Sequence, residues 1–395
     1  MIFYKETNLK ETSIGEIPRD WDIVKLGDAS ETIKGKKPTR LLDEKSENAI
    51  PYLTAEYMRS NSNVQWCERD DQNVIQVNKN DLLMIWDGSY SGDVFIGFEG
   101  ALASTMIKIT PNENLDRNFL HYFLTTKFDF IRGTTSGTGV PHVSKSIFEN
   151  LLVPLPPLNE QRAIVGVLGV VDSVIAKTGE VIAKTERLKK GLMQTLLTRG
   201  IGHKEYEQTP IGTTPKTWQI ESLSNVFKLA SGKPRPSEIS EKATQETPYP
   251  VYGGNGILGY ANAFLLDQET IVIGRVGEYC GSVYKTTKFS WITDNALYAT
   301  EISKDFNLEF LKHLLSFLNL NKFKKKMGQP LLTQTIIYSI DIQHPPLPEQ
   351  QKIADVLLTI DRKLEIEKNE KARLERVKRG LMDLLLTGKI RFKVD

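Results

Sequence analysis

The sequence predicts an α+β protein with two tandem α/β domains, each followed by one long helix. The chain repeats itself over nearly its whole length. In each copy, short apolar runs between glycine-rich turns come first, and about 40 residues without proline or a strand pattern come second. Because each long helix needs a partner of equal length, we expect the two to pair as an antiparallel coiled coil with pseudo-twofold symmetry.

The repeat is clearest in the phrases "PPLNEQ" from Pro156 and "PPLPEQ" from Pro345. At this offset of 189 residues, 156–202 aligns with 345–391 without a gap, and about 20 of 47 positions are identical. The same offset matches "GSYSGDV" from Gly88 with "GEYCGSV" from Gly277, and an offset of 197 matches "IGEIPRDWDIVKL" with "IGTTPKTWQIESL". The chain is therefore two copies of a unit of about 190 residues.

The repeat divides the chain into four parts, which are a first domain over 1–153, a long helix over 154–205, a second domain over 206–343 and a second long helix over 344–395. In the domains, "DLLMIW" and "ETIVIG" predict strands, whereas "NFLHYFLTTKFDFI" and "LEFLKHLLSFLNL" predict short helices. At about 1.5 Å per residue, each long helix should extend for about 60 Å.

An apolar stripe at steps of three and four residues predicts the seam of the helix pair, strongest near the helix ends. Its members are Ile164, Leu168, Val171, Ile175, Leu192 and Leu196 in the first helix, and Ile353, Leu357, Ile360, Leu364, Leu381 and Leu385 in the second.

Composition limits the class of protein. The longest apolar run, "AIVGVLGVV", is far shorter than the roughly 20 residues that a membrane span needs, so we expect a cytoplasmic protein with no membrane partner. Cys67 and Cys280 form no disulfide framework, and with five scattered histidines they show no metal-ligand spacing. We expect both cysteines to be buried small apolar residues.

Charge alone does not indicate nucleic acid. The chain has 51 basic and 49 acidic residues, and the first domain has 17 basic against 22 acidic. Basic residues gather locally in "KGKKPTR" from Lys34 and "LNKFKKK" from Leu320. Such clusters are also common on ordinary solvated surfaces.

Motifs of catalysis are missing. "GNGILG" from Gly254 matches the dinucleotide pattern, but no clean strand pattern ends at it and no helix pattern starts from it, so its glycines are expected in a loop. The sequence has neither a P-loop nor a G-x-S-x-G motif, and leucine follows the paired prolines where amino-methyltransferases have tyrosine or phenylalanine. We expect no catalytic residues in this chain.

The order of the motifs resembles the specificity subunit of type I restriction-modification systems. Each copy is similar to that family's target-recognition domain, from I-G-x-x-P-x-x-W through G-x-Y-x-G-x-V and G-x-P to P-P-L-x-E-Q, the long helix and G-L-M-x-x-L-L-T. The second copy adds "VYGGNGILGYA", "IVIGRVG" and "TDNA". The first copy departs from this pattern, with "LASTM" near the place of "TDNA".

The resemblance implies a subunit with no catalytic site that reads a bipartite asymmetric site in double-stranded DNA. Each target-recognition domain would read one half, the helix pair would fix the gap between the halves, and two methyltransferase subunits would dock to methylate adenine. A nuclease and translocase subunit can also join. This chain would then bind no cofactor, with S-adenosylmethionine on the methyltransferases and ATP and Mg²⁺ on the nuclease subunit.

Polar residues in the glycine-punctuated loops are the candidates for DNA binding, because arginine and lysine favour guanine edges and asparagine and glutamine favour adenine. The candidates are Lys36, Lys37, Arg40, Tyr90 and His142 in the first domain, and Lys233, Arg235, Asn255, Arg275, Tyr279 and Gln329 in the second. The two tyrosines are alternatively interpreted as residues packed in a hairpin.

Two other functions stay open at this point. A non-catalytic bivalent scaffold could bind proteins or glycans through its two globular ends, and the nearly neutral charge suits it better than DNA. The salt dependence of binding separates the two, since only DNA binding should fall steeply with salt. An oxidoreductase built around "GNGILG" is a distant third hypothesis.

Overall fold

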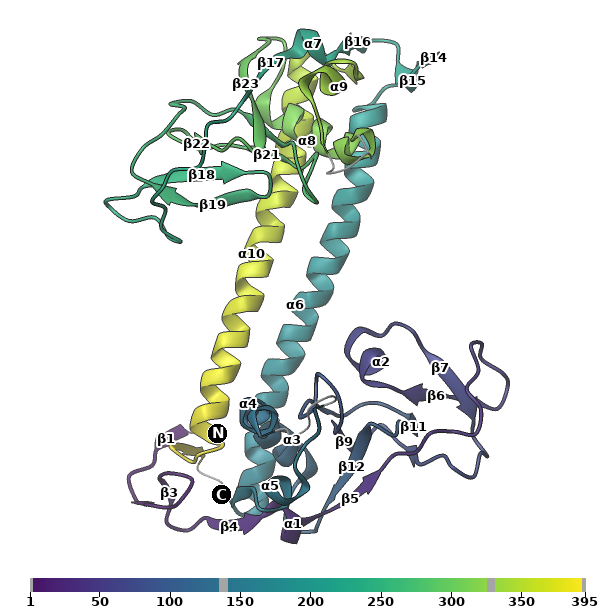
Figure 1. The fold of residues 1–395 in the computed structure, drawn as a ribbon, viewed down its shortest axis with the longest axis vertical. Helices are drawn as coiled ribbons and strands as arrows, with labels where there is room; N and C mark the ends of the chain where they lie inside the picture. Colours follow the sequence, from purple (N-terminus) through teal and green to yellow (C-terminus); the bar gives the residue numbers. More distant parts are fainter. Residues whose placement is uncertain (1–2, 135–140, 325–330, 393–395) are drawn as a thin grey trace. The chain divides into compact units, whose positions relative to one another are not determined.

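The computed structural model describes residues 3–134, 141–324 and 331–392. It contains two compact units, one formed by Met1–Thr178 with Glu370–Asp395 and the other by Gly179–Asn369 (Figure 1). Each unit therefore holds one globular domain and parts of both long helices, whereas the sequence-based boundaries follow the chain in order. Within the described residues, no helix is both long enough and apolar enough to cross a membrane.

In the first unit, the globular domain has two four-stranded sheets. The helix-side sheet has the order β10-β9-β12-β5, and the outer sheet has the order β7-β6-β11-β8, in which β11 runs parallel to β6. The strands are β5 Ser30–Lys34, β6 Ala49–Leu53, β7 Gln65–Glu68, β8 Gln76–Val77, β9 Leu82–Ile85, β10 Val94–Phe95, β11 Gly100–Leu102 and β12 Met106–Pro111. The helices are α1 Leu26–Ala29, α2 Ala55–Ser60, α3 Arg117–Thr126, α4 Phe128–Gly133 and α5 Lys145–Glu149.

The second unit repeats this plan. Its helix-side sheet has the order β17-β23-β20-β21, and its outer sheet the order β19-β18-β22, with β22 parallel to β18. The strands are β17 Phe227–Ser231, β18 Tyr249–Gly253, β19 Gly256–Ala261, β20 Ile271–Gly274, β21 Val283–Lys285, β22 Trp291–Ile292 and β23 Ala296–Ile302. The helices are α7 Leu223–Val226, α8 Leu308–Leu318, the 3₁₀ helix η1 Leu320–Phe323 and α9 Gln334–Tyr338.

Short two-stranded ladders complete both units. Their strands are β1 Phe3–Lys5 with β25 Ile390–Phe392, β2 Leu9–Lys10 with β3 Ile17–Pro18, β4 Asp22–Lys25 with β13 Leu152–Leu155, β14 Tyr206–Thr209 with β15 Gly212–Pro215, and β16 Gln219–Ser222 with β24 Asp341–His344. The mixture of helices and strands confirms the predicted α+β class.

The apolar runs of the sequence become strands buried on both faces. In β9, Leu82 and Met84 point into the core beside the long helices, whereas Leu83 and Ile85 point into the core of the outer sheet. Successive side chains of a strand alternate between faces, so a strand with a core on each side must be apolar at every position. This explains why "DLLMIW" and "ETIVIG" lack alternation. Cys67 and Cys280 are free and buried, as expected.

The expectation that no strand ends at "GNGILG" is wrong. Strand β18 does end at the "GNGILG" motif, and the chain returns immediately as β19. Gly256 has a φ of 88°, which a side chain would strain. Gly254 therefore lies in the β-hairpin turn, Gly256 and Gly259 lie in β19, and no helix follows that could bind a pyrophosphate.

The paired prolines precede the predicted long helices, which are α6 Leu158–Arg199 with 42 residues and α10 Leu347–Leu385 with 39. A buried glutamine in the first turn ties each helix to its own domain. Gln161 donates to the carbonyls of Pro156 and Asn114, at 2.8 and 2.9 Å, and accepts from the backbone of Asp116 at 2.7 Å. Gln350 makes the equivalent three bonds to Pro345, Asp305 and Asn307, each 2.9 Å long.

The neighbouring glutamate binds the tryptophan of the entry motif. Trp21 donates to Glu160 at 3.1 Å, and Trp218 donates to Glu349 at 3.3 Å. The phrase P-P-L-x-E-Q therefore occurs twice because each helix is fixed to a domain by the same two side chains.

Within each unit the two helices run side by side and antiparallel. In the first unit, Asp172 of α6 pairs with Lys378 of α10 at 2.6 Å. In the second, Lys189 of α6 pairs with Asp361 of α10 at 2.5 Å. The two aspartates are equivalent at the offset of 189, and so are the two lysines. The same ion pair between α6 and α10 therefore occurs in both units.

Of the twelve predicted seam residues, six are buried and six are half-buried. Ile164, Leu168 and Leu385 are buried in the first core, with Leu381 packed against it, whereas Ile353 and Leu357 are buried in the second core, with Leu192 and Leu196 beside it. Leu364 is buried, and Val171, Ile175 and Ile360 are half-buried.

Polar groups beside the seam are strongly perturbed by burial. Burial and the positive charge of Lys378 lower the pKa of His121 to about 4. Burial and the positive charge of Lys312 also lower the pKa of His313 to about 4. Burial would raise the pKa of Asp361, but the hydrogen bond from Lys189 and the charge of Lys312 outweigh it and lower that pKa. Both histidines are therefore neutral at pH 7, and the aspartate is charged.

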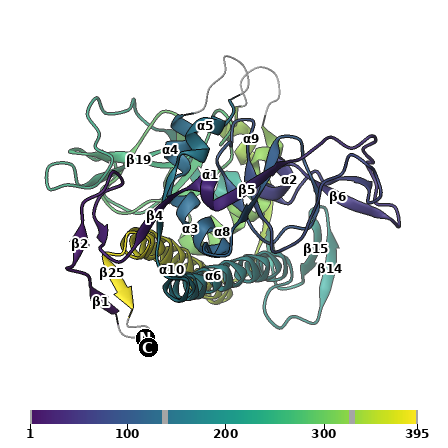
Figure 2. The same ribbon diagram turned by 90° about the horizontal axis from the view of Figure 1, so that it is seen from below.

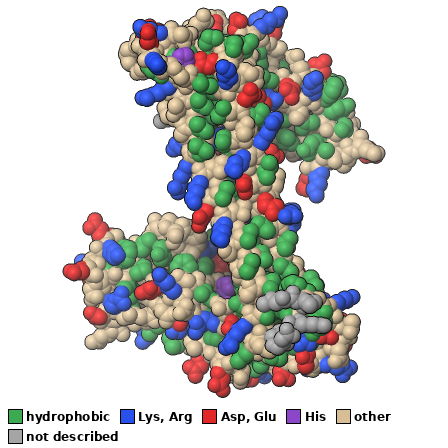
Figure 3. All heavy atoms as spheres, turned by 180° about the vertical axis from the view of Figure 1, so that it is seen from behind, with side chains coloured by type: hydrophobic (Ala, Val, Ile, Leu, Met, Phe, Trp, Pro, Cys, Tyr) green, Lys and Arg blue, Asp and Glu red, His purple; other side chains and the backbone are tan. Residues whose placement is uncertain are grey.

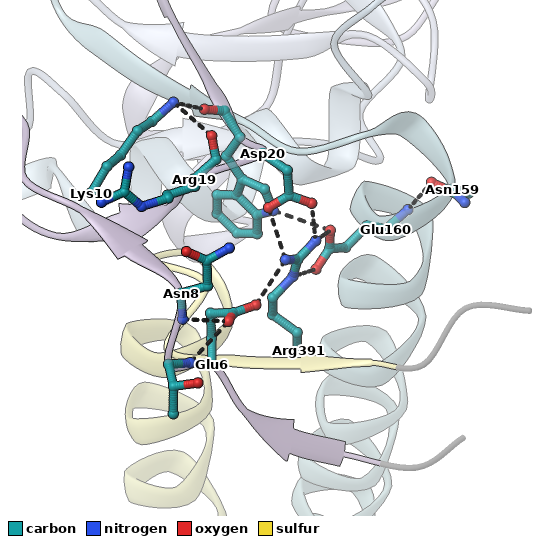
Figure 4. A network of polar contacts seen from close by, with 10 residues as sticks. Glu6, Asn8, Lys10, Arg19, Asp20, Asn159, Glu160 and Arg391 are labelled. Atoms are coloured by element: carbon teal, nitrogen blue, oxygen red, sulfur yellow. Dashed lines mark hydrogen bonds and ion pairs between the residues drawn. The ribbon is translucent and has the colours of Figure 1, made fainter.

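The first unit is completed by the end of the chain. Strand β25 pairs with β1, and the two lie side by side in Figure 2. From β25, Arg391 binds Glu160 through Nε and Nη2 at 2.8 Å each, Glu6 at 2.9 Å and Asp20 at 2.9 and 2.8 Å (Figure 4). The side chains of Arg391 and Glu160 are only 12% and 5% exposed. One arginine thus joins both ends of the chain to the start of α6.

Replacement of Arg391 by alanine should lower the free energy of opening the first unit by about 3 kcal/mol, because it leaves the Glu160 carboxylate buried without its positively charged partner. Native-state hydrogen exchange should report faster exchange in the first unit and unchanged exchange in the second. The exposed ion pair of Arg373 with Glu370 provides the control, and Arg373→Ala should leave exchange unchanged. Equal effects of the two substitutions would contradict this role of Arg391.

The network should also make the first unit sensitive to acid. The backbone N–H of Asn8 and the guanidinium of Arg391 lower the pKa of Glu6, and Arg391 lowers that of Asp20. A carboxylate with a lowered pKa stabilises the folded state above its unfolded pKa and loses this effect as the pH falls through its folded pKa. The difference in Tm between the wild type and Arg391→Ala should therefore be full near pH 7 and shrink below about pH 4. A difference that does not change with pH would argue against these ion pairs.

Candidate nucleic-acid interface

In the first domain, separate segments meet at the loop that follows β9. Lys34 at the end of β5 pairs with Asp87 at 2.9 Å. The backbone of His142 bridges to Asp87, and the backbone N–H of Gly88 donates to the carbonyl of Pro141 at 2.8 Å. The predicted candidates Lys36, Lys37, Tyr90 and His142 all lie within three residues of these contacts, so the fold brings their segments together.

The second domain brings its candidates together in the same way. Arg275, which follows β20, donates from Nη1 to the hydroxyl of Ser231 at the end of β17, at 2.8 Å. A Cβ on Gly274 would lie 2.6 Å from the carbonyl oxygens of both Gly254 and Tyr279, so the hairpin turn that carries Asn255 is pressed against this loop. The backbone N–H of Lys233 donates to the carbonyl of Ile292, at the end of β22.

A glycine lets the chain leave the helix-side sheet at each site. A Cβ on Gly35 would lie 2.2 Å from the carbonyl oxygen of Ala103, and one on Gly232 would lie 2.1 Å from that of Thr293. No side chain fits at either place, so the residue must be glycine. The lysines that follow, Lys36 and Lys233, are thereby placed at equivalent positions at the two loop clusters.

The two sites share a backbone frame. Gly92 N–H donates to Ile85 at 2.8 Å, and its equivalent Gly281 donates to Gly274 at 2.7 Å. Val143 N–H donates to the carbonyl of Trp86 at 3.0 Å. In the second domain, the equivalent Leu332 N–H donates to the carbonyl of Arg275 at 2.8 Å.

The side chains on this frame differ between the domains. Arg275 stands where the first domain has Trp86, which packs edge-on against Phe148. Leu331 stands where the first domain has His142. The structure therefore keeps the frame and changes the groups that it presents, as loops on a rigid scaffold can do.

Most of the candidates are open to solvent. Tyr90 and Tyr279 are each 47% exposed, so neither is packed away in a hairpin. Arg275 is half-buried, and its Nε is buried with no hydrogen-bond partner among the described residues. The other exposed candidates are Lys36, Lys37, Arg40, His142, Lys233, Arg235 and Asn255. Gln329 lies outside the described residues.

Arg40 and Arg235 lie on the segments that follow the lysines of the two loop clusters. Arg40 follows Thr39, which binds Asp71 at 2.6 Å beside the outer sheet. Arg235 lies in the exposed segment after Lys233. The surfaces of both units carry interspersed acidic and basic side chains on the face that Figure 3 shows.

Sequence reasoning missed several residues at the first site. The guanidinium carbon of Arg59, from α2, lies 3.4 Å from the centre of the Tyr90 ring, and Nε of Arg59 lies 3.4 Å from Asp93. Burial raises the pKa of Asp93, whereas the charge of Arg59 opposes this rise. Lys34 could have been found, because it begins the basic cluster "KGKKPTR" that also contains Lys36 and Lys37. Arg59 has no equivalent in the repeat and is revealed only by the fold.

Comparison with known proteins identifies the family. The model of the type I restriction modification DNA specificity domain matches residues 18–187 and 215–376. The MjaVIII specificity subunit of a type I restriction enzyme from Methanocaldococcus jannaschii is 35% identical over 421 residues, covering 100% of this chain and 98% of its own. The EcoprrI specificity subunit from Escherichia coli is 25% identical and covers 62% of this chain.

Solved structures show the same fold. The S subunit of a type I restriction-modification system from M. genitalium has a TM-score of 0.67 at 17% identity, over 93% of this chain and 96% of its own. A chain solved in work on complex assembly and conformational transition of the type I R-M system has a TM-score of 0.53 at 18% identity, over 94% of this chain and 99% of its own.

The chain belongs to the family of type I restriction-modification DNA specificity subunits. Such a subunit is the non-catalytic, DNA-recognising member of its system. The resemblance drawn from the motifs is confirmed, and the alternative of a protein- or glycan-binding scaffold has no support from these relatives.

Arg275→Ala should weaken binding of the assembled complex to its DNA by about 1–3 kcal/mol, because it removes a half-buried guanidinium that is pre-positioned by Ser231. The loss should depend on the sequence of the DNA, and competition with duplexes of altered sequence will measure this. Lys228→Ala, on the same strand as Ser231 but in an exposed pair with Glu301, is the matched control and should change affinity less than twofold. Unchanged affinity, or a loss independent of sequence, would exclude a base-reading role for Arg275.

Proposed function

We propose that this chain reads a bipartite asymmetric DNA site, one half with each globular domain, and recruits two adenine methyltransferase subunits. The observation that carries the proposal is the pair of equivalent loop clusters, built on one backbone frame but bearing different side chains. Two like modules with unlike loops suit two different half-sites better than one symmetric site. Each module is fixed to the start of its own long helix by the same Gln and Glu anchors.

Partner subunits supply the chemistry in this proposal. The methyltransferases would bind S-adenosylmethionine, and a nuclease and translocase subunit, where one joins, would bind ATP and Mg²⁺. The nearly neutral charge of this chain fits such a division, because the partners can contribute phosphate contacts while these loops contribute base contacts. The relative studied for complex assembly of the type I R-M system supports recruitment of partners.

The test is to co-express this chain with an adjacent adenine methyltransferase and map methylated adenines by single-molecule sequencing. A split motif that disappears without this chain is the expected result. Exchange of residues 1–153 for another target-recognition domain should then change one half of the motif only. The donor should retain Glu6, Asp20 and Trp21 equivalents, so that the contacts to Glu160 and Arg391 survive the exchange.

Two results would contradict the proposal. A complex that assembles and binds S-adenosylmethionine but shows no chain-dependent methylation would do so. Binding by the complex that scarcely changes with salt would also do so, because phosphate contacts release counterions and make DNA binding fall steeply as salt rises.

A further inference from the structure

The connection between the first two strands of the outer sheet differs between the domains. In the second domain, β18 turns directly into β19 at Gly254 and Asn255. In the first domain, the equivalent strands β6 and β7 are separated by α2, which begins after the capping Thr54 and carries Arg59 in its last turn. Both connections reach the loop of the G-x-Y-x-G motif, through Gly254 against Gly274 and through Arg59 on Tyr90.

Arg59 is held by two contacts that leave its terminal amino groups available. The guanidinium carbon is 3.4 Å from the centre of the Tyr90 ring, and Asp93 approaches Nε at 3.4 Å. The side chain is 37% exposed, and neither terminal amino group donates a hydrogen bond to another described residue. A stacked and anchored guanidinium loses little conformational entropy on binding, so this arginine is pre-organised.

The surroundings favour a neutral base edge as its target. The carboxylate of Asp93 beside the guanidinium would repel a DNA phosphate, whereas O6 and N7 of guanine are uncharged acceptors. A planar guanidinium can bind both of these atoms at once, and this is the commonest specific contact of arginine in the major groove. In the competing interpretation, Arg59 stacks on the exposed Tyr90 for structural reasons only. That interpretation predicts that substitution of Arg59 leaves the recognised bases unchanged.

We propose that Arg59 is a specificity-determining residue of the first domain, which reads a guanine in the half-site of that domain from its stacked position on Tyr90. This inference rests on the proposed function. The second domain has Tyr279 in place of Tyr90 and Ser282 in place of Asp93, and its hairpin turn presents Asn255 rather than an arginine. The β6–β7 and β18–β19 connections are thus the elements that give the half-sites different readers.

The experiment uses the complex of the full chain with its methyltransferase partners. Arg59→Ala and Arg59→Lys should each reduce affinity for the cognate duplex about 10-fold or more, and the methylation motif should relax at one guanine of the first half-site. Arg59→Lys retains the charge but not the planar fork, so its loss of selectivity separates base reading from phosphate attraction. Tyr90→Phe retains the stacking ring and should keep the motif, whereas Tyr90→Ala should relax the same position.

Arg69, an exposed arginine just after β7, provides the matched control. Arg69→Ala should leave the motif unchanged and alter affinity less than twofold. An unchanged motif in both Arg59 variants, or a loss of affinity that is equal for all sequences, would overturn the assignment of Arg59. Such a result with normal wild-type methylation would leave the proposed function intact, whereas absence of chain-dependent methylation in the wild type would overturn the function itself.

Discussion

Each long helix is fixed to a globular domain by a glutamate and a glutamine in its first turn. The glutamine is fully buried and satisfies three backbone groups, and the glutamate accepts from a tryptophan at the entrance of the domain. A buried amide with all of its partners in place holds one geometry, because any displacement leaves polar groups unsatisfied. The position of the recognition loops relative to the helix of the same unit follows from this junction.

The junction differs between the units in how the glutamate is satisfied. Glu160 binds Arg391 from the end of the chain, whereas Glu349 binds His203 at 2.8 Å and the backbone of Ile201 at 2.9 Å, both from the segment that follows α6. The segment after α10 thus binds the anchoring glutamate of the first unit, and the segment after α6 binds that of the second. The first unit consequently depends on segments from two distant parts of the chain.

Recognition is separated from this support. The helix-side sheet and its glycine crossings at Gly35 and Gly232 are nearly the same in both domains, and the groups that differ stand on loops above them. Arg275 replaces Trp86, and a helix bearing Arg59 replaces the turn bearing Asn255. A frame that is held by backbone hydrogen bonds tolerates such replacements, since its stability does not depend on the side chains that are exchanged.

The amino-acid sequence alone predicted the repeat, the order of domains and helices, and the apolar stripe, because proline pairs, strand runs and a helical period are local signals. It also predicted that Lys36, Tyr90, Lys233 and Arg275 lie in loops. Which loops meet became visible only in the folded chain. Arg59 stacks on Tyr90 across 31 positions of sequence, and Arg391 reaches Glu160 across 231 positions. Contacts of this kind carry no local pattern, since they depend on how sheets and chain ends pack in space, and only the fold could reveal them.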